Sequence, residues 1–487
     1  MYHGKRARFG TFLMRNIFTD KGFHLTMKTR VLQAVFAVLS AILVSCFSSA
    51  AQSGSKAVTD KTKNSSLAPE VVHTGTAPTG YSVTFRYANP QAKKVQVKGE
   101  WLFARPSELP LLAGTPDHPV IEGQGIMPAE WKPGDFPLQR PNSTGPNFLV
   151  TEMTKGKDGV WTYTTPLPSG VFTYSYIVDC DNPTGARCPQ IADPSNLPWT
   201  EKSGVTESSV ARNSQVFVPS DPKFGTVDYS WQAPAKVQGK LTHETYPSPG
   251  HVTPKDKNYI VVYTPPGYDP ARTNPYPTFY LSHGGGENEL GWSTQGVVNN
   301  ILDNLINTGQ IQPIVVVMPN GGGFANSTFN EAYDRDMIDS LIPYVEKQYH
   351  VSTSDRDRAF SGLSMGGMLT NSFLINHPEV FQYYGMMSAG LPPQNSELTP
   401  AQIAALKGKS IWVGGGWQDV IHAVGFSPNG TPTHLGPARE VSTLAKAGIP
   451  VTTNFVYGGH EWYVWRILVK DFLTRFAFLP PTYAAWQ

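Results

Sequence analysis

The stretch Gly362-Leu363-Ser364-Met365-Gly366 places a serine between two glycines at the junction of two predicted elements. A short apolar run, 358–361, precedes it, and a helix-compatible run, 365–376, follows it. This pattern predicts a sharp strand-to-helix turn that exposes the serine hydroxyl, as in a nucleophile elbow. Glycine is expected two positions to either side of the serine, because the neighbouring strand and helix leave no room for a Cβ atom there.

Four other strand-like runs end in glycine clusters. Near-continuous apolar runs of this kind are typical of strands buried on both faces, as in a parallel sheet. In open α/β sheets the ligand crevice lies beyond the carboxyl ends of the strands, so we expect these clusters to gather at one edge of a sheet together with the serine. The runs with their clusters are 277–283 with glycines 284–286, 313–320 with glycines 321–323, 410–413 with glycines 414–416, and 451–457 with Gly458, Gly459 and His460.

A serine hydroxyl is a poor nucleophile until a base removes its proton. His460 is the best candidate base, because it follows a predicted strand in the loop Gly458-Gly459-His460-Glu461-Trp462. Asp419 is expected to orient the imidazole, since Glu461 is too close to His460 along the chain to reach round it easily. The chain order Ser364, Asp419, His460 is that of α/β-hydrolases.

Ester cleavage also needs hydrogen-bond donors aimed at the developing oxyanion. The backbone N–H of Met365 is one expected donor, and that of Gly285 or Gly284 is the other. Neither a metal nor an organic cofactor is required, and no zinc-type spacing of cysteines and histidines is present. The other histidines of this region have different expected roles: His377 caps a helix end, His283 orders the turn before the glycines, and His422 and His434 could line the pocket from the loop after the aspartate.

Length and composition predict two domains. The chain has 487 residues, enough for two sizeable cores. Its formal net charge is +2 and only 16% of its residues are charged. No basic stripe stands out, so a nucleic-acid partner is not expected.

The predicted secondary structure changes along the chain. Residues 80–218 contain short strands and no convincing long helix, which predicts an all-β, immunoglobulin-like sandwich. Within them, the Pro/Gly-rich stretch 104–147 predicts a long loop that reaches the active-site rim. Residues 236–487 alternate strands and helices, which predicts one α/β-hydrolase domain with a mainly parallel sheet. The expected connections are a flexible tether at 52–79 and a Pro-containing linker at 219–235.

Residues 1–51 are predicted to be a signal or targeting segment. Met27 is a candidate for the true start, because Met27-Lys28-Thr29-Arg30 supplies a positive region before the apolar run 31–44. Simple cleavage and lipidation of Cys46, in the lipobox-like Leu43-Val44-Ser45-Cys46, are both left open. No other stretch is long and apolar enough to span a bilayer. The protein is therefore expected to be secreted or periplasmic, or an outer-membrane lipoprotein if Cys46 is lipidated.

Export leaves Cys180 and Cys188 as the expected mature pair, because an oxidising compartment favours a disulfide. The segment between them contains Asn182-Pro183 and Gly185, which can fold the loop back. The stabilisation should be about 2–3 kcal/mol because the closed loop is short. Two free thiols are the alternative.

Six segments of residues 236–487 carry a family resemblance: Val262-Tyr263-Thr264-Pro265-Pro266-Gly267-Tyr268, Leu281-Ser282-His283-Gly284-Gly285-Gly286, Val316-Val317-Met318-Pro319-Asn320-Gly321, Leu341-Ile342-Pro343-Tyr344-Val345-Glu346, Gly362-Leu363-Ser364-Met365-Gly366-Gly367 and Gly459-His460-Glu461-Trp462. They resemble the feruloyl and acetyl-xylan esterases of carbohydrate esterase family one. That group is related to the esterase-D, enterochelin-esterase and mycolyltransferase-type α/β-hydrolases. The resemblance implies that Ser364, Asp419 and His460 are catalytic, and that Met365 and Gly285 bind the oxyanion.

The resemblance also implies substrate contacts at Trp292, Trp417 and Asn320. Trp292 lies near the acyl pocket or is a buried core aromatic, and the sequence leaves both roles open. Trp417 marks a departure from the family pattern, in which the acid loop reads Gly-x-x-Asp after a strand. Here two further glycines precede Gly416-Trp417-Gln418-Asp419, so Trp417 is expected to reshape the pocket.

Residues 80–218 are similar to the early-set, immunoglobulin-like domains that precede such esterases and glycogen-branching-type enzymes. The similarity lies in Lys94-Val95-Gln96-Val97-Lys98-Gly99-Glu100-Trp101, Pro168-Ser169-Gly170-Val171-Phe172-Thr173-Tyr174 and Asp193-Pro194-Ser195-Asn196. It leaves open stacking of glycans on Trp101, Trp161 or Trp199, and packing beside the catalytic domain, which we favour.

The sequence therefore predicts an exported serine esterase that forms an acyl-serine intermediate on a plant-polysaccharide ester, such as feruloylated or acetylated xylan. A siderophore (enterochelin-type) esterase or an acyltransferase is the alternative among enzymes. A glycan-binding surface protein with an inert hydrolase domain is the alternative of another class, and the intact Ser, Asp and His candidates argue against it. The oligomeric state is left open.

Overall fold

The computed structural model describes residues 67–108, 125–138, 140–142, 145–182, 185, 187–197, 213–324, 329–392, 395–419 and 436–479. These residues fall within one compact unit, Asp60–Gln487. Among them, no helix combines the length and the apolar character needed to cross a bilayer. The predicted signal segment with Cys46, most of the tether, Trp199, His422 and His434 lie outside the described residues.

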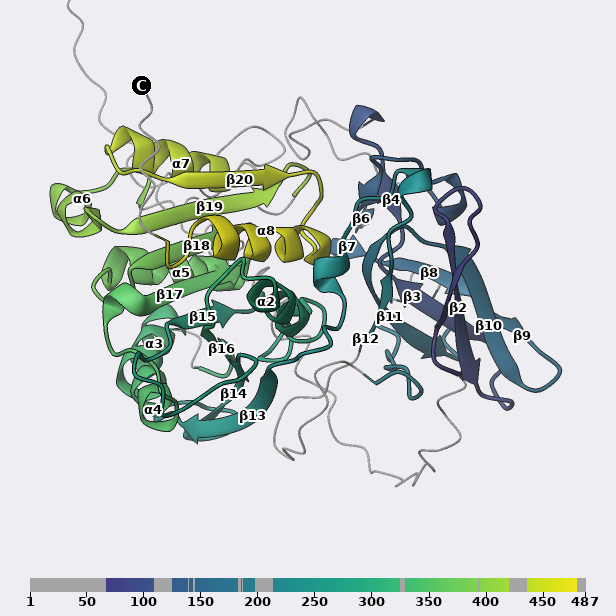
Figure 1. Cartoon of the computed structure of the whole chain (residues 1–487), viewed down its shortest axis with the longest axis horizontal. Helices are drawn as coiled ribbons and strands as arrows, with labels where there is room; N and C mark the ends of the chain where they lie inside the picture. Colours follow the sequence, from purple (N-terminus) through teal and green to yellow (C-terminus); the bar gives the residue numbers. More distant parts are fainter. Residues whose placement is uncertain are drawn as a thin grey trace, which may run out of the picture. The chain divides into compact units, whose positions relative to one another are not determined.

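A mixed eight-stranded sheet lies at the centre of the C-terminal half, with the strand order β13-β14-β16-β15-β17-β18-β19-β20 (Figure 1). β14 pairs antiparallel with β13 and β16, and the other neighbours pair in parallel. The predicted mainly parallel sheet is therefore confirmed. Its strands are β13 (Lys240–Pro247), β14 (Lys257–Thr264), β15 (Thr278–Ser282), β16 (Val315–Pro319), β17 (Arg358–Leu363), β18 (Tyr383–Met387), β19 (Ser410–Gly416) and β20 (Thr452–Val456).

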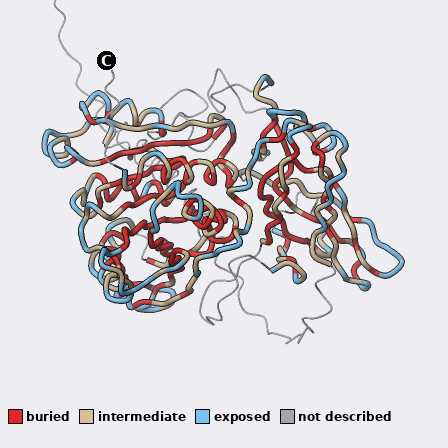
Figure 2. Tube along the Cα trace, viewed as in Figure 1, coloured by how far each residue is buried: buried red, intermediate tan, exposed pale blue. Residues whose placement is uncertain are grey.

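Helices cover both faces of this sheet, and each face has its own hydrophobic core. The strands between the helices are largely buried (Figure 2). In β14, Val261 and Tyr263 belong to one core and Ile260 and Val262 to the other, because successive side chains of a strand alternate between its faces. The first core contains residues of α2 (Val298–Asn307) and α8 (Trp462–Arg475). The second contains residues of α3 (Phe329–Asp336), the π-helix η7 (Met337–Leu341), α4 (Ile342–Gln348), α5 (Met365–Asn376), α6 (Pro400–Leu406) and α7 (Pro437–Lys446).

Two four-stranded antiparallel sheets form the N-terminal half, in the orders β1-β2-β10-β9 and β12-β11-β3-β8. Both contribute to one core, in which Phe85, Trp161 and Tyr174 are buried. The all-β character is as predicted, and the immunoglobulin-like assignment stays a prediction. The strands are β1 (Glu70–His73), β2 (Tyr81–Ala88), β3 (Val95–Gly99), β8 (Leu149–Glu152), β9 (Thr154–Lys155), β10 (Val160–Pro166), β11 (Gly170–Val178) and β12 (Ser214–Val218).

Short elements fill the connections of the N-terminal half. Two small antiparallel pairs, β4 with β5 and β6 with β7, lie within the stretch predicted to be a long loop. The elements are β4 (Phe103–Ala104), η2 (Pro106–Glu108), η3 (Pro128–Glu130), β5 (Phe136–Pro137), β6 (Arg140–Asn142) and β7 (Gly145–Asn147), and η8 (Asp355–Asp357) precedes β17 in the other half.

One glycine cluster differs from its predicted place. The sequence puts glycines 414–416 after a strand, whereas the structure includes them in β19. A Cβ at Gly414 would lie 2.4 Å from the Trp412 ring, and one at Gly416 would lie 2.2 Å from the carbonyl oxygen of Gly458. These glycines therefore make room for neighbouring groups rather than forming a turn.

The predicted linker 219–235 is packed along both halves and contains η4 (Pro222–Phe224) and η5 (Ser230–Gln232). Asn304 of α2 donates its amide to the carbonyl oxygens of Trp231, at 3.2 Å, and Ala233, at 2.7 Å. Gln232 Oε1 accepts the backbone N–H of Val171 in β11 at 3.1 Å. The linker thus connects α2 to a strand of the N-terminal half.

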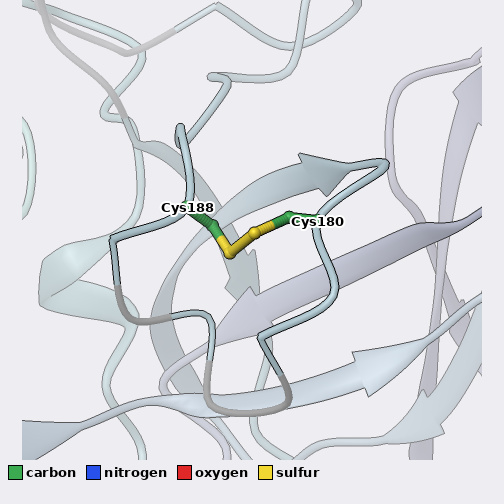
Figure 3. Close-up of a disulfide and its surroundings, with 2 residues drawn as sticks. All are labelled: Cys180 and Cys188. Atoms are coloured by element: carbon green, nitrogen blue, oxygen red, sulfur yellow. A yellow bond between two sulfur atoms is a disulfide. The ribbon is translucent and has the colours of Figure 1, made fainter.

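Cys180 and Cys188 form the predicted disulfide in the segment after β11 (Figure 3). Their Cα atoms lie 6.0 Å apart. Beyond the disulfide, the backbone of Ile191 exchanges two hydrogen bonds with Tyr176, at 2.8 and 2.9 Å. The segment therefore folds back onto the strand that it leaves.

A buried ion pair joins the two halves. Arg466 of α8 donates through Nη2 to Glu100 Oε2 at 2.8 Å, and their side chains are only 2% and 6% exposed. Arg466 also donates to the carbonyl oxygens of Val171 and Gln295, each at 2.8 Å. The same Glu100 oxygen accepts the backbone N–H of Thr173 at 3.0 Å. Because a buried charge is costly unless it is paired and hydrogen-bonded, this set of partners allows the guanidinium to lie inside the protein.

Glu100→Gln should lower the free energy of unfolding by about 3–5 kcal/mol, because breaking a buried pair leaves an uncompensated charge. Urea unfolding of the full chain, followed by tryptophan fluorescence, measures the loss. Glu152→Gln is the matched control, since Glu152 lies 3.0 Å from Lys94 but its side chain is 70% exposed. An exposed pair contributes about 0–1 kcal/mol. Losses of the same small size in both variants would contradict the role of the buried pair.

Candidate active site

Ser364 lies in a sharp turn between β17 and α5. Its φ of 52° and ψ of −115° are unusual for a residue with a side chain. Its backbone N–H donates to the carbonyl oxygen of Met387 at the end of β18, at 2.9 Å. Ser364 is half-buried. The strand, turn and helix predicted around this serine are therefore present.

Two glycines make this turn possible. A Cβ at Gly362 would lie 2.4 Å from the backbone of Gly366, and one at Gly366 would lie 2.6 and 2.7 Å from the carbonyl oxygens of Ser282 and His283. Backbone atoms at such distances cannot move away as a flexible side chain could. The steric prediction from the sequence is confirmed, and α5 begins in direct contact with the end of β15.

His460 and Asp419 meet at the carboxyl edge of the sheet. Asp419 follows β19 and His460 follows β20, and these strands are parallel neighbours. His460 Nδ1 lies 2.9 Å from Asp419 Oδ2, and the two side chains are 10% and 1% exposed. Gln418 fastens the two loops together, because its backbone N–H donates to the carbonyl oxygen of Gly458 and its Oε1 accepts the Gly458 N–H, both at 2.9 Å.

Trp465 of α8 connects His460 to the strand end beside the serine. Its ring meets the imidazole edge-on, with the centroids 4.9 Å apart. Its indole N–H donates to Ser388 Oγ at 3.0 Å, and Ser388 directly follows Met387, which accepts the backbone N–H of Ser364. His460 contacts Asp419 directly, and the backbone N–H of Ser364 ties the serine to the same cluster.

The other candidate acid and base have structural roles. Glu461 Oε1 accepts the backbone N–H of Gly459 at 2.9 Å. His377 is the C-cap residue of α5, as the sequence predicts. Among the residues that the structure describes, no group of three or more His, Cys, Asp or Glu side chains is arranged to hold a metal ion.

The loop after β15 supplies backbone donors close to the serine. A Cβ at Gly284 would lie 3.5 Å from Ser364 Cβ. The Gly284 N–H already donates to Glu287 Oε2 at 3.3 Å. Gly285 is exposed, and no described atom lies within 4 Å of the position of a Cβ there. On the other side, Met365 is the first residue of α5, so its N–H has no acceptor within the helix. Of the two glycines left open by the sequence, this geometry favours Gly285.

His283 fixes the shape of this loop. Its Nε2 accepts the backbone N–H of Gly321 at 2.8 Å, so the ring proton lies on Nδ1, which donates to the carbonyl oxygen of Gly284 at 2.8 Å. Burial lowers the pKa of His283, which favours this neutral form. The imidazole thus joins the glycine runs that follow β15 and β16, in agreement with the ordering role predicted for it.

A carboxyl that the sequence analysis did not single out lies behind the same loop. Glu287 Oε1 accepts the indole N–H of Trp462 at 3.0 Å and an amide N–H of Gln295 at 3.1 Å. Burial raises the pKa of Glu287 to about 7, against the opposing influence of these hydrogen bonds and of His460. The sequence signal for it is weak, since it is one acidic residue after three glycines.

The three expected substrate contacts differ in accessibility. Trp292 is 1% exposed and packs edge-on against Trp462, with the ring centroids 5.1 Å apart. Of the two roles left open for Trp292, this position favours the core aromatic. Trp417 and Asn320 are both partly exposed, and Trp417 packs on Phe455 at 5.0 Å between centroids.

Residues of the N-terminal half contact the loop that carries His460. Phe136 stacks on Tyr457 with the ring centroids 5.6 Å apart. Leu138 Cδ1 lies 3.0 Å from the position of a Cβ at Gly459. These contacts support the prediction that the stretch 104–147 reaches the rim of the site. A cavity of about 370 Å³ is lined from both halves, by residues that include Trp131, Phe136, Phe172, Trp417, Tyr457 and Tyr463.

The chain is similar to known esterases. Residues 252–476 match the family described as putative esterase. An endo-1,4-beta-xylanase/feruloyl esterase of Xylanibacter ruminicola is 30% identical over 330 residues, which cover 65% of this chain and 40% of that protein. Endo-1,4-beta-xylanase Y of Acetivibrio thermocellus is 33% identical over 198 residues, which cover 37% of this chain and 17% of that protein. The chain therefore spans less than half of the length of either relative.

Among solved structures, the enterobactin esterase FES of Shigella flexneri aligns with 86% of this chain and 98% of its own, at 17% identity and a TM-score of 0.48. The family match and the named relatives confirm the resemblance to esterases predicted from the sequence.

Gly366→Ala should lower the free energy of unfolding by about 3 kcal/mol or more, because the new Cβ would press on two backbone carbonyl groups. Gly285→Ala is the matched control, since its Cβ would meet open space, and its stability should change by no more than about 1 kcal/mol. Urea unfolding of both variants measures the difference. Equal stabilities would show that the turn can relax around a side chain.

Proposed function

Residues 252–476 match the esterase family, and from that premise we propose that the protein is a serine carboxylic-ester hydrolase with Ser364, Asp419 and His460 as its catalytic residues. The observation that carries the proposal is the 2.9 Å contact between His460 and Asp419, at the sheet edge where the strained turn presents Ser364. A positive φ at a residue with a side chain is strained, and a sharp strand-to-helix turn of this kind is typical of an exposed nucleophile.

The proton path follows from the orientation of the imidazole. With Nδ1–H bonded to Asp419, Nε2 of His460 presents a lone pair and takes the Ser364 hydroxyl proton as Oγ attacks the ester carbonyl carbon. The carbon–oxygen bond to the alcohol then breaks, and His460 returns the proton to the leaving alcohol. Water repeats the attack on the acyl-serine, which releases the acid and restores the hydroxyl.

The oxyanion formed in both steps would accept hydrogen bonds from the backbone N–H groups of Met365 and Gly285. Met365 belongs to the first turn of α5, so its N–H has no acceptor within the helix. This N–H also lies at the positive end of the helix dipole, which stabilises a negative charge nearby. Gly285 is supplied by the loop that His283 holds, and its open surroundings leave space for the carbonyl group.

The proposed substrate is a feruloyl or acetyl ester of a plant polysaccharide such as xylan. One relative, named endo-1,4-beta-xylanase/feruloyl esterase, supports this class. Trp417 and Asn320 are partly exposed and are the proposed substrate contacts. An enterochelin-type ester or an acyl acceptor other than water is the alternative that a substrate panel separates.

We further propose that residues 80–218 are an immunoglobulin-like accessory domain that packs beside the catalytic domain, 236–487, of an exported protein. The burial of Trp101 and Trp161, 0% and 7% exposed, argues against glycan stacking on these two rings. The contacts of Phe136 and Leu138 with the His460 loop support a role in shaping the site.

Ser364→Ala should lower kcat for methyl ferulate or a p-nitrophenyl ester by about 10⁴- to 10⁶-fold, because it removes the atom that is acylated. Thermal unfolding should be unchanged. Ser396→Ala, at an exposed serine before α6, is the control and should keep full activity. Retention of most of the activity by Ser364→Ala would overturn the assignment.

Asp419→Asn should lower kcat by about 10³- to 10⁴-fold, because the neutral amide no longer stabilises the imidazolium or fixes the tautomer. Steady-state kinetics with the same ester measures the loss. A variant as fast as the parent would place the catalytic acid elsewhere. Hydrolysis of feruloyl, acetyl and catecholate-lactone esters by the parent protein, compared side by side, identifies the acyl group.

A further inference from the structure

Glu287 connects three segments that meet around the proposed catalytic centre. Its Oε2 accepts the backbone N–H of Gly284 in the loop that also carries Gly285. Its Oε1 accepts N–H groups from Trp462, two residues after His460, and from Gln295, before α2. One carboxyl group thus ties the oxyanion loop to the start of α8.

The position of this carboxyl is close to the proposed nucleophile. The point where a Cβ of Gly284 would lie is 3.5 Å from Ser364 Cβ and 3.6 Å from Glu287 Oε2. The serine and the carboxyl therefore flank the same glycine. Because Glu287 occupies the Gly284 N–H, the next N–H of this loop, that of Gly285, is the one proposed above as the oxyanion donor.

The hydrogen-bond partners of Glu287 suit its ionised form. All three are N–H donors, and a carboxylate can accept every one, whereas a protonated oxygen would face a donor. His460 is the titratable group whose charge acts on Glu287, and burial holds the pKa of this carboxyl at about 7. Two charged side chains contact neighbouring segments. Arg466 donates to the carbonyl oxygen of Gln295 at 2.8 Å, and Glu461 accepts the backbone N–H of Gly459.

We propose that Glu287 is a positioning residue for the hydrolysis proposed above: its carboxylate holds the oxyanion loop against α8 and places a second negative charge toward His460. The inference rests on the proposed function. Glu287 touches neither the ester nor the transferred proton in this scheme. It acts through the Gly284–Gly285 backbone, and through the imidazolium that forms when Ser364 attacks.

Glu287→Gln tests this role, because it keeps the shape of the side chain but removes the charge and sets an amide N–H against an N–H donor. We expect kcat for methyl ferulate to fall about tenfold with KM within about twofold, since oxyanion and imidazolium stabilisation act in the transition state. The unfolding temperature should change little, because removal of a buried charge offsets the hydrogen bond that the amide cannot accept. Loss of stability in proportion to activity would indicate a structural role only and overturn the proposal.

The pH dependence of kcat/KM gives a second readout. His460 must be unprotonated to act as the base, and protonation of Glu287, like its replacement by Gln, should lower kcat/KM about tenfold, so the acid limb of log(kcat/KM) should be steeper than a slope of one over about one pH unit. In Glu287→Gln only His460 remains, and the slope should be about one. Glu440→Gln is the matched control: burial raises the pKa of Glu440 to about 8, and its carboxyl accepts from Asn371 in α5 at 3.0 Å, away from the glycine loop. It should keep the parent slope and kcat.

Glu287→Asp keeps the proposal testable if the Gln variant does not fold. It retains a titratable carboxyl on a shorter side chain, so the steeper part of the acid limb should persist while kcat falls. The role of Glu287 would be overturned if either variant kept the parent kcat, or if Glu287→Gln kept the parent slope. These outcomes would leave the proposed function intact as long as Ser364→Ala is inactive. A parent protein that hydrolyses none of the esters would instead overturn the proposed function.

Discussion

The close packing of backbone against backbone at Gly362 and Gly366 is the constraint on which the geometry of the site depends. Because neither residue carries a Cβ, the first turn of α5 can rest on the carbonyl groups of Ser282 and His283. That single contact sets the position of two loops at once. The serine leaves β17 in a strained conformation, and the glycine loop leaves β15 beside it, so the same packing fixes the proposed nucleophile and the loop that carries its proposed oxyanion donor.

Hydrogen bonds then extend this order outward from the turn. His283 connects the loops after β15 and β16, Gln418 connects the loops after β19 and β20, and Trp465 spans from His460 to Ser388. Each of these side chains is buried and forms hydrogen bonds to its partners. Buried and satisfied polar networks of this kind hold loops in one conformation. Hydrogen bonds thereby join the loops after five strands into one rim.

Much of this could be predicted from the sequence because the signals are local. The run 365–376 coincides with α5, the cysteine pair lies within one short segment, and the acid-before-histidine order led to the pair that the structure brings into contact. What the sequence could not supply depends on approach between distant segments. Arg466 and Glu100 are 366 residues apart, and Glu287 meets Trp462 across 175 residues. The Trp412 ring leaves no room for a side chain at Gly414, and the loop at Gly458 leaves none at Gly416. Trp292 was ambiguous for the same reason, since only its surroundings distinguish a core ring from a pocket wall.

The guanidinium of Arg466 has a consequence for how such a protein could be shortened or recombined. Its carboxylate partner and one of its carbonyl acceptors come from the N-terminal half. A catalytic half cut free at the linker would have to hydrate that cation or bury it unpaired, in the helix that directly follows the histidine loop. The N-terminal half of a homologue could therefore replace this one only if it placed an acidic side chain at the position of Glu100. Glu100 of the N-terminal half is thus the counterion of a cation in the half that contains the proposed catalytic residues.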